Sequence, residues 1–162
     1  PTVKRYDIIA IISGPEPQRT VLEDLLIPQL SDSGLDCLVI LGKPEETINK
    51  RKGNIEIRSH LTAKEMQMAI QQSDVVISRP GYSTIMDLAA LGKKAIFVPT
   101  PGQTEQEYLA RYHKNAGNCF WMRQGRFNLK NALEQNKNYR GLSNIDSEKR
   151  LENVVRDFVG SL

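Results

Sequence analysis

Short apolar segments alternate with amphipathic segments along the whole chain, and this alternation restricts the fold more than any other feature. The first apolar segment, residues 6–13, is almost continuously hydrophobic, which is typical of a parallel strand buried on both faces. A turn and a segment of helical periodicity separate each such strand from the next. This order predicts an α/β protein, with a parallel sheet covered by helices on both faces.

The pattern predicts six strands, and we expect a doubly wound, Rossmann-like order 3-2-1-4-5-6 because crossovers are right-handed. The expected strands are 6–13, 36–41, 54–58, 74–78, 95–98 and 119–122. The expected helices are 20–30, 62–72, 81–91, 104–115, 129–136 and 146–159. A length of 162 residues suits one domain, so residues 1–162 are taken as a single unit.

Three helix starts carry a threonine followed three residues later by a glutamate, the spacing of a capping box. We expect capping boxes at Thr20 with Glu23 and at Thr62 with Glu65. At Thr104 with Glu107 the same spacing leaves two interpretations open. Glu107 either caps the helix or faces the cleft beside it.

Composition excludes several classes of protein. The net charge of +3 comes from scattered basic residues without the basic and aromatic stripe of a nucleic-acid reader, so no nucleic acid is expected. The apolar runs are too short to span a membrane, and no secretory signal is present. Cys37 and Cys119 lie in separate apolar runs and lack the spacing of a disulfide framework or a zinc site. We therefore expect a cytoplasmic protein with no metal and no cofactor.

The first residue, Pro1, indicates processing or a piece of a longer chain, and we favour the second interpretation.

Ligands of open α/β sheets bind outside the carboxyl ends of the strands, where the strand order reverses. Here the loops at that point are 13–19 and 78–84, and each leads into a helix. A helix start offers free backbone N–H groups and a partial positive charge, which favour a phosphate. Arg19 could also reach a phosphate.

The loop 78–84 is the more informative of the two. Gly81 permits close approach of the backbone to a ligand, and Ser83 and Thr84 place hydroxyls in the first helical turn. Asp87 lies one turn further on the same side, where a carboxylate can accept hydrogen bonds from ribose hydroxyls. The alternative is that Ser83 and Thr84 only cap the helix and that Asp87 only complements its dipole.

Two further segments could reach the same cleft. In residues 99–107, Gln106 and Glu107 lie in the first turn of a helix, and amide and carboxylate groups suit sugar hydroxyls. His60 follows the third strand, where its ring could pack on a base. His113 lies late in a helix, where it is expected to complement the C-terminal dipole. The chain lacks the G-x-G-x-x-G, P-loop and G-x-S-x-G motifs, which disfavours dinucleotide binding, NTP hydrolysis and α/β-hydrolase chemistry.

Three stretches resemble the C-terminal domain of the peptidoglycan N-acetylglucosaminyltransferases, a glycosyltransferase family 28 type. They are SRPGYSTIMDL at 78–88, GKKAIFVP at 92–99 and QTEQEYLA at 103–110. The resemblance covers the whole chain in architecture and is specific over residues 74–117. It implies one Rossmann-like half of a GT-B fold, an inverting transferase that takes a hexosyl group, such as N-acetylglucosamine, from a UDP-sugar.

In that family Tyr82, Ser83 and Thr84 would hold the diphosphate, and Asp87 would hold the ribose. Gln106 and Glu107 would contact the sugar, the backbone at 60–61 would contact the uracil edge, and the loop at 13–15 would face the acceptor. The expected donor-binding residues are Ser13, Gly14, His60, Leu61, Arg79, Gly81, Tyr82, Ser83, Thr84, Asp87, Gln103, Gln106 and Glu107.

The resemblance also implies that the catalytic base belongs to a missing N-terminal acceptor domain, so no catalytic residue is expected here. That half would also make any membrane contact. Two departures indicate a relative with different acceptor chemistry: Asp87 stands where the family has Glu, and Pro15 and Pro17 remove N–H donors from the first loop. A free-standing donor subunit, a UDP-sugar hydrolase or epimerase, and a protein-binding module remain open alternatives.

Overall fold

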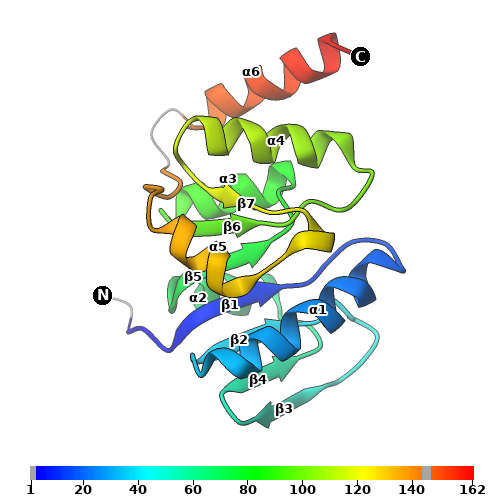
Figure 1. Cartoon of the computed structure of the whole chain (residues 1–162), viewed down its shortest axis with the longest axis vertical. Coiled ribbons are helices and arrows are strands. Elements are labelled where there is room, and N and C mark those ends of the chain that lie inside the picture. The colour runs from blue at the N-terminus through cyan, green and yellow to red at the C-terminus, as the bar shows by residue number, and fades with distance from the viewer. Residues whose placement is uncertain (1–2, 144–146) are drawn as a thin grey trace.

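The computed structural model describes residues 3–143 and 147–162, with side chains over 3–143 and 153–162. Pro1 and the expected start of the last helix at residue 146 lie outside these ranges. Seven strands form one sheet in the order β3-β4-β2-β1-β5-β6-β7 (Figure 1). They are β1 Tyr6–Ile11, β2 Cys37–Ile40, β3 Asn49–Lys52, β4 Ile55–Arg58, β5 Ser73–Ser78, β6 Lys94–Phe97 and β7 Phe120–Trp121.

The helices connect these strands in the expected order. They are α1 Gln18–Ser33, α2 Ala63–Gln71, α3 Tyr82–Ala90, α4 Thr104–Asn115, α5 Leu129–Asn136 and α6 Ser147–Gly160, with a short 3-10 turn η1 Gln124–Arg126. From β1 the chain crosses over to β2 on one side and, later, to β5 on the other. This reversal is the doubly wound arrangement that the sequence predicts, and it places β1 and β5 side by side at the centre.

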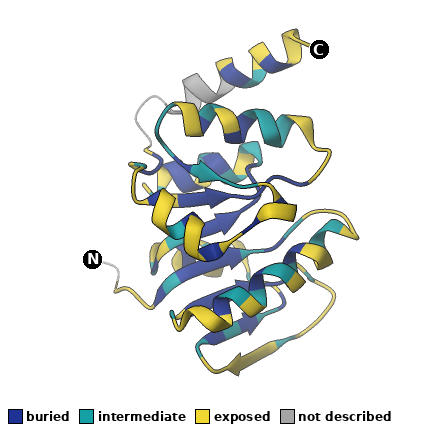
Figure 2. Cartoon of the chain, in the orientation of Figure 1, coloured by how far each residue is buried: buried dark blue, intermediate teal, exposed yellow. Residues whose placement is uncertain are grey.

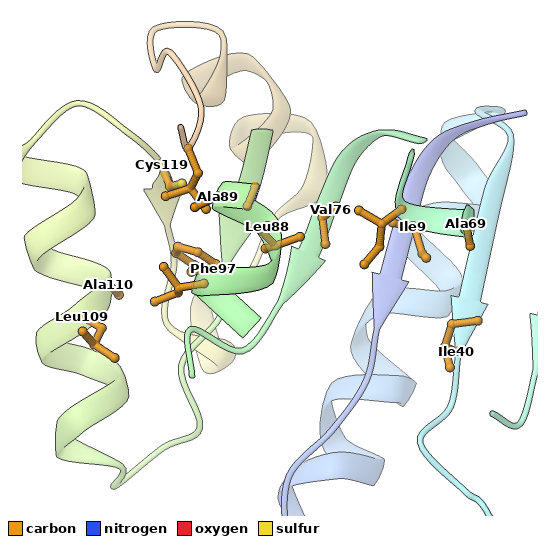
Figure 3. Close-up of a cluster of buried hydrophobic side chains, with 14 of the residues drawn as sticks. Ile9, Ile40, Ala69, Val76, Leu88, Ala89, Phe97, Leu109, Ala110 and Cys119 are labelled. Carbon is orange, nitrogen blue, oxygen red and sulfur yellow. The ribbon is translucent and has the colours of Figure 1, made fainter. Parts of the chain in front are cut away.

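Two hydrophobic cores cover the two faces of the sheet. One contains Leu22, Leu26 and Leu30 of α1 with residues of α5. The other joins residues of α2, α3, α4 and α6 to the opposite face of the strands. The central strands are mostly buried, whereas the helices are exposed on their outer sides (Figure 2). In Figure 3, Leu109 and Ala110 of α4 point toward Phe97 of β6, which is fully buried.

The sheet differs from the prediction at one edge. The strand β3 pairs with β4 in antiparallel orientation, so the sheet has seven strands and is mixed. Its sequence, NKRK, is exposed at every position. The prediction missed it because periodicity signals a strand only where one face is buried. A short, lysine-rich edge is a common way to discourage pairing with another chain.

The helix starts give three different outcomes. The capping box of Thr62 and Glu65 is confirmed, with both reciprocal hydrogen bonds formed. The capping box expected at Thr20 is wrong, because α1 begins at Gln18 and the carboxylate of Glu16 accepts hydrogen bonds from Thr20. At α4 the N-cap is Gln103, and no side chain caps the helix, so Glu107 is free of that task.

Cys37 and Cys119 are both free and buried. They lie in different cores on opposite faces of the sheet, which separates them as expected.

His113 differs from its prediction. It is a buried residue of α4 and its pKa is lowered to about 4 by burial, so it does not carry the charge that a dipole contact would need. Within the described ranges, no helix is both long and apolar enough to cross a membrane.

Candidate functional site

The loops that follow β1, β5 and β6 meet at the carboxyl edge of the sheet. The strand β1 pairs in parallel with β5, and β5 pairs in parallel with β6. Their carboxyl ends therefore point to the same edge, and the three loops leave it next to one another. This edge is where an open α/β sheet binds its ligand.

The side chain of Arg79 joins these three loops. Its guanidinium donates to the carbonyl oxygen of Ser13 at 3.1 Å, to that of Val98 at 3.0 Å and to that of Pro99 at 3.3 Å. A fourth bond reaches the carbonyl of Gln18 at 3.2 Å. A planar guanidinium with five fixed donors is suited to bind several carbonyls in different directions at once.

Arg79 is 4% exposed, and burial lowers its pKa to about 10, so it remains protonated at neutral pH. It forms no ion pair within residues 3–143. Four of its five N–H donors are already used, which leaves little capacity for a direct bond to a ligand. Its geometry therefore suits the positioning of the loops, and its charge acts on the site from a buried position among them.

Gly14 lies close to this guanidinium. Its φ of +112° is a conformation that favours glycine, and a Cβ added there would lie 3.4 Å from Thr100 Oγ1 and 3.7 Å from Arg79 Nε. The loop after β1 thus packs closely on the loops after β5 and β6. The structure brings the predicted residues Ser13, Gly14 and Arg79 together.

The start of α1 is occupied by a carboxylate of the protein itself. Glu16 accepts from the backbone N–H of Thr20 at 3.0 Å and from its hydroxyl at 2.8 Å, and it pairs with Arg19 at 2.7 Å. These bonds lower the pKa of Glu16. A phosphate at this helix start would have to displace Glu16, so the suggestion that Arg19 binds a phosphate loses support.

The start of α3 is open by comparison. Its N-cap is Gly81, and no side chain caps it. Ser83 is exposed and Thr84 is half-buried, so the alternative that these hydroxyls serve only as caps is wrong. The first-turn N–H groups and the hydroxyls remain available together. An uncapped helix start at the point where the strand order reverses has the geometry that can bind an anion.

Asp87 lies one turn further along α3 and is exposed. It lines a hollow of about 340 Å³ between α2 and α3, with Ala63, Met66 and Ile70 on its apolar wall. Asp87 follows Thr84 by three residues, which places both on one side of the helix. The carboxylate is thus near the uncapped start of α3 and beside an apolar groove.

His60 and Leu61 precede α2 at the same edge of the sheet. His60 is exposed, and its Nδ1 lies 3.1 Å from the hydroxyl of the buried Ser59. Leu61 packs against the same hydrophobic core as Tyr82 and Met86 of α3. The ring of His60 is therefore within hydrogen-bond distance of a buried hydroxyl, and residues 60–61 lead into α2, which lines the groove.

Gln106 and Glu107, both predicted to contact the sugar, differ in how free they are to bind a ligand. The Oε1 of Gln106 accepts from the backbone N–H of Thr100 at 2.8 Å, so this amide fixes the loop and keeps only its NH₂ group for a ligand. Glu107 does not cap and pairs loosely with Arg123 at 3.7 Å. Gln103 is exposed at the N-cap. Glu107 is consequently better placed than Gln106 to accept from sugar hydroxyls.

Several polar groups at this edge were not predicted. The hydroxyls of Ser78 and Thr100 are buried and lack a hydrogen-bond partner within the described residues, as does Oε1 of Gln124. The position of Ser78 at a predicted strand end was a usable signal, whereas Thr100 and Gln124 carried none. No cluster of three or more His, Cys, Asp or Glu in the described residues is arranged to hold a metal ion.

A family model describes the same architecture. Residues 25–154 match the glycosyltransferase family 28 C-terminal domain. The chain belongs to this family. The match includes β5, the uncapped start of α3, Asp87 and the first turn of α4. These are the elements that form the open part of the site.

The curated relatives are UDP-N-acetylglucosamine–N-acetylmuramyl-(pentapeptide) pyrophosphoryl-undecaprenol N-acetylglucosamine transferases. The protein from Sulfurihydrogenibium sp. is 27% identical over 165 residues, which cover 93% of this chain and 47% of the relative. The protein from Histophilus somni is 32% identical over 108 residues, covering 66% of this chain and 28% of the relative. The chain thus spans half or less of the length of the curated relatives it matches.

Solved structures show the same fold. MurG of Acinetobacter baumannii superposes with a TM-score of 0.65 at 15% identity, over 94% of this chain and 50% of that one. The solution structure of ALG13 gives 0.63 at 14% identity, over 92% of this chain and 96% of that one. The expected GT-B half is therefore confirmed as a fold.

Proposed function

We propose that this domain binds a UDP-sugar and forms the donor half of an inverting hexosyltransferase. The observation that carries the proposal is the uncapped start of α3 at the reversal of strand order, with Ser83, Thr84 and Asp87 on it. The curated relatives are named as transferases of N-acetylglucosamine from UDP-N-acetylglucosamine, which supports this donor class.

In the proposed complex, the diphosphate accepts hydrogen bonds from the first-turn N–H groups of α3 and from the hydroxyls of Ser83 and Thr84. The ribose hydroxyls donate to the carboxylate of Asp87, and the base lies along the backbone at 60–61. The sugar reaches Glu107 and the NH₂ group of Gln106. Each of these groups is on the same edge of the sheet and is compatible with one extended ligand.

The proposed chemistry needs a stabilised leaving group. When an acceptor hydroxyl attacks the anomeric carbon, the UDP departs with additional negative charge on its diphosphate. The start of α3 and the buried guanidinium of Arg79 in the preceding loop stabilise the negative charge of the departing diphosphate electrostatically. The base that removes the acceptor proton belongs, in this proposal, to a separate acceptor-binding half.

The ribose contact gives the sharpest test of the donor site. Isothermal titration calorimetry with UDP, ADP and GDP is expected to show binding that is strongest for UDP. Asp87→Ala removes a hydrogen-bonded charge and is expected to weaken UDP binding by about 1–3 kcal/mol, roughly 5- to 150-fold. Glu134→Ala is the matched control, because this exposed carboxylate lies on α5 on the other face.

Equal UDP affinity in wild type and Asp87→Ala would remove Asp87 from the ribose role. An absence of heat with all three nucleotides would contradict the donor site as a whole. For transfer itself, we expect no turnover of UDP-N-acetylglucosamine until an acceptor-binding half is supplied.

That half could belong to a separate subunit. ALG13 supports this form of the proposal, because the likeness extends over 96% of that solved chain, compared with 50% of the MurG chain. Co-purification of this chain with an acceptor-binding partner, together with transfer activity of the pair only, is the expected result. Transfer by this chain alone would contradict it.

A further inference from the structure

A second hollow lies at the carboxyl edge of the sheet, beside the proposed donor site. We call it the tryptophan pocket, and its walls include Pro99, Pro101, Glu107, Trp121, Gln124 and Arg126. Its volume is about 500 Å³, within the range of small-molecule sites. It is formed by the loop after β6, the first turn of α4 and the segment that follows β7.

The apolar walls of the pocket are flat. The indole of Trp121 and the rings of Pro99 and Pro101 line it. The guanidinium of Arg123 lies 5.4 Å from the centre of the Trp121 ring and 3.7 Å from the carboxylate of Glu107. These two contacts hold the aromatic wall next to a charged acceptor. Flat apolar surfaces of this kind suit the C–H face of a pyranose ring.

The polar groups of the pocket include both acceptors and donors. Gln124 is 3% exposed, and its Nε2 donates to Gln18 Oε1 at 2.8 Å. Its Oε1 is buried and lacks a partner within the described residues, which is costly unless a ligand donates to it. Glu107 is a second acceptor, and the exposed Arg126 is a donor.

This combination selects the chemical class of the ligand. Each sugar hydroxyl donates one hydrogen bond and accepts others, so different hydroxyls of one ring can donate to Gln124 Oε1 and to Glu107 and accept from Arg126. A phosphate or carboxylate could use only the arginines and would be repelled by Glu107. An apolar ligand would leave Gln124 Oε1 unpaired. A neutral, hydroxyl-rich ring satisfies the whole set.

Glu107 lines the pocket and is also the proposed contact of the donor sugar, so it would lie between the two rings. Trp121, Gln124 and Arg126 extend the pocket along β7 and the segment after it, away from α3. The strands β5 and β7 are separated by β6, so their ends lie about 10 Å apart. A donor whose diphosphate lies at α3 after β5 places its sugar over the loop after β6, and the next ring position is over β7. We propose that the tryptophan pocket binds a second hexopyranose ring, presented by the acceptor. The acceptor assignment rests on the proposed function, whereas the saccharide assignment rests on the pocket alone.

Trp121 is the only tryptophan of the chain, so its fluorescence reports on this pocket. The chain, saturated with UDP, is titrated with methyl N-acetyl-β-D-glucosaminide and with methyl β-D-glucoside. We expect a saturable change of emission with at least one of them. Inorganic phosphate is expected to give none, and a phosphate response like that of the glycosides would overturn the saccharide assignment.

Two variants test the polar groups. Gln124→Leu removes the buried acceptor, and Arg126→Ala removes an exposed donor without disturbing the core. Each is expected to weaken glycoside binding about fivefold or more. Lys137→Ala is the control, because this exposed side chain on the far end of α5 pairs only with Glu134 among the described residues. A thermal midpoint measured by circular dichroism confirms that each variant is folded.

The absence of a saturable change, or unchanged binding in both variants, would overturn the proposal. If UDP-N-acetylglucosamine abolishes glycoside binding while UDP does not, the ring is the donor's and the acceptor assignment is wrong. Calorimetry with UDP keeps the two proposals separate. Lost UDP binding with glycoside binding retained would contradict the donor site alone, and the reverse result would contradict the pocket alone.

Discussion

The guanidinium of Arg79 is surrounded by carbonyl oxygens from the loops after β1 and β6 and from the start of α1. Arg79 therefore links the segments that surround the candidate anion site at α3. Sequence comparison alone suggested a donor-binding residue, whereas the geometry gives a positioning residue whose charge acts at a distance.

Arg79→Lys tests this role. A lysine keeps the charge but cannot bind carbonyls in four directions, so some are left unpaired. We expect the free energy of unfolding to fall by about 2–3 kcal/mol, measured by urea denaturation. Arg111→Lys, at an exposed position of α4, serves as control and should leave the midpoint unchanged. An equally stable Arg79→Lys protein would show that the hydrogen bonds of the Arg79 guanidinium do not stabilise the fold.

At the scale of elements, a repeated motif leads to different structures. The spacing of Thr62 with Glu65 recurs at Thr104 with Glu107, and only the first forms a capping box. In α4 the N-cap falls one residue earlier, at Gln103. The Thr100 N–H is satisfied instead by Gln106, from within the helix. Local spacing proposes a cap, and the path of the preceding loop decides whether it forms.

This difference predicts unequal effects of one substitution. Thr62→Ala is expected to lower the free energy of unfolding by about 1 kcal/mol, because the first turn of α2 loses its acceptor. Thr104→Ala is expected to change it by less than about half of that, since the Thr104 hydroxyl caps nothing. Chemical denaturation of the two variants measures both values. Equal losses would mean that the two helix starts are capped alike in solution.

At the scale of the whole molecule, His113 couples stability to pH. It lies on the buried side of α4, near the rings of Phe97 and Tyr112, and its Nε2 has no hydrogen-bond partner within the described residues. Burial lowers its pKa from the ordinary value of 6.5 to about 4. The unfolded chain therefore takes up a proton at a higher pH than the folded protein does.

The sign of the effect follows from linkage. The stabilisation is complete above about pH 6.5 and is lost as the pH falls toward 4, with a slope of up to about 1.4 kcal/mol per pH unit. Urea denaturation between these limits measures it. In His113→Gln this contribution is expected to vanish, so the difference between the two proteins isolates it from the carboxylates. Parallel profiles of wild type and variant would contradict the prediction.

The sequence predicted most of the architecture, for identifiable reasons. The apolar runs of β1, β2, β5 and β6 reflect strands that are mostly buried, so their positions were correct to within a few residues. The strand β3 was missed because its side chains are all exposed and leave no periodic signal. The candidate residues at α3 were proposed from the sequence, because hydroxyls and a carboxylate share one helix side, and their role stays a prediction. Gln124 and Trp121 were missed because nothing local marks them as neighbours of Glu107.

The order of strands and helices, the reversal between β1 and β5, and the polar start of α3 were determined by the sequence itself. These features depend on local periodicity and on general rules of chain connection. Only the tertiary structure decided which helix start is open. Glu16 fills the start of α1, while Gly81 leaves that of α3 free. It also decided that Arg79 holds loops together and that Gln106 fixes the backbone of Thr100. Such outcomes depend on which unpaired donors and acceptors the packed chain brings within about 3 Å of one another.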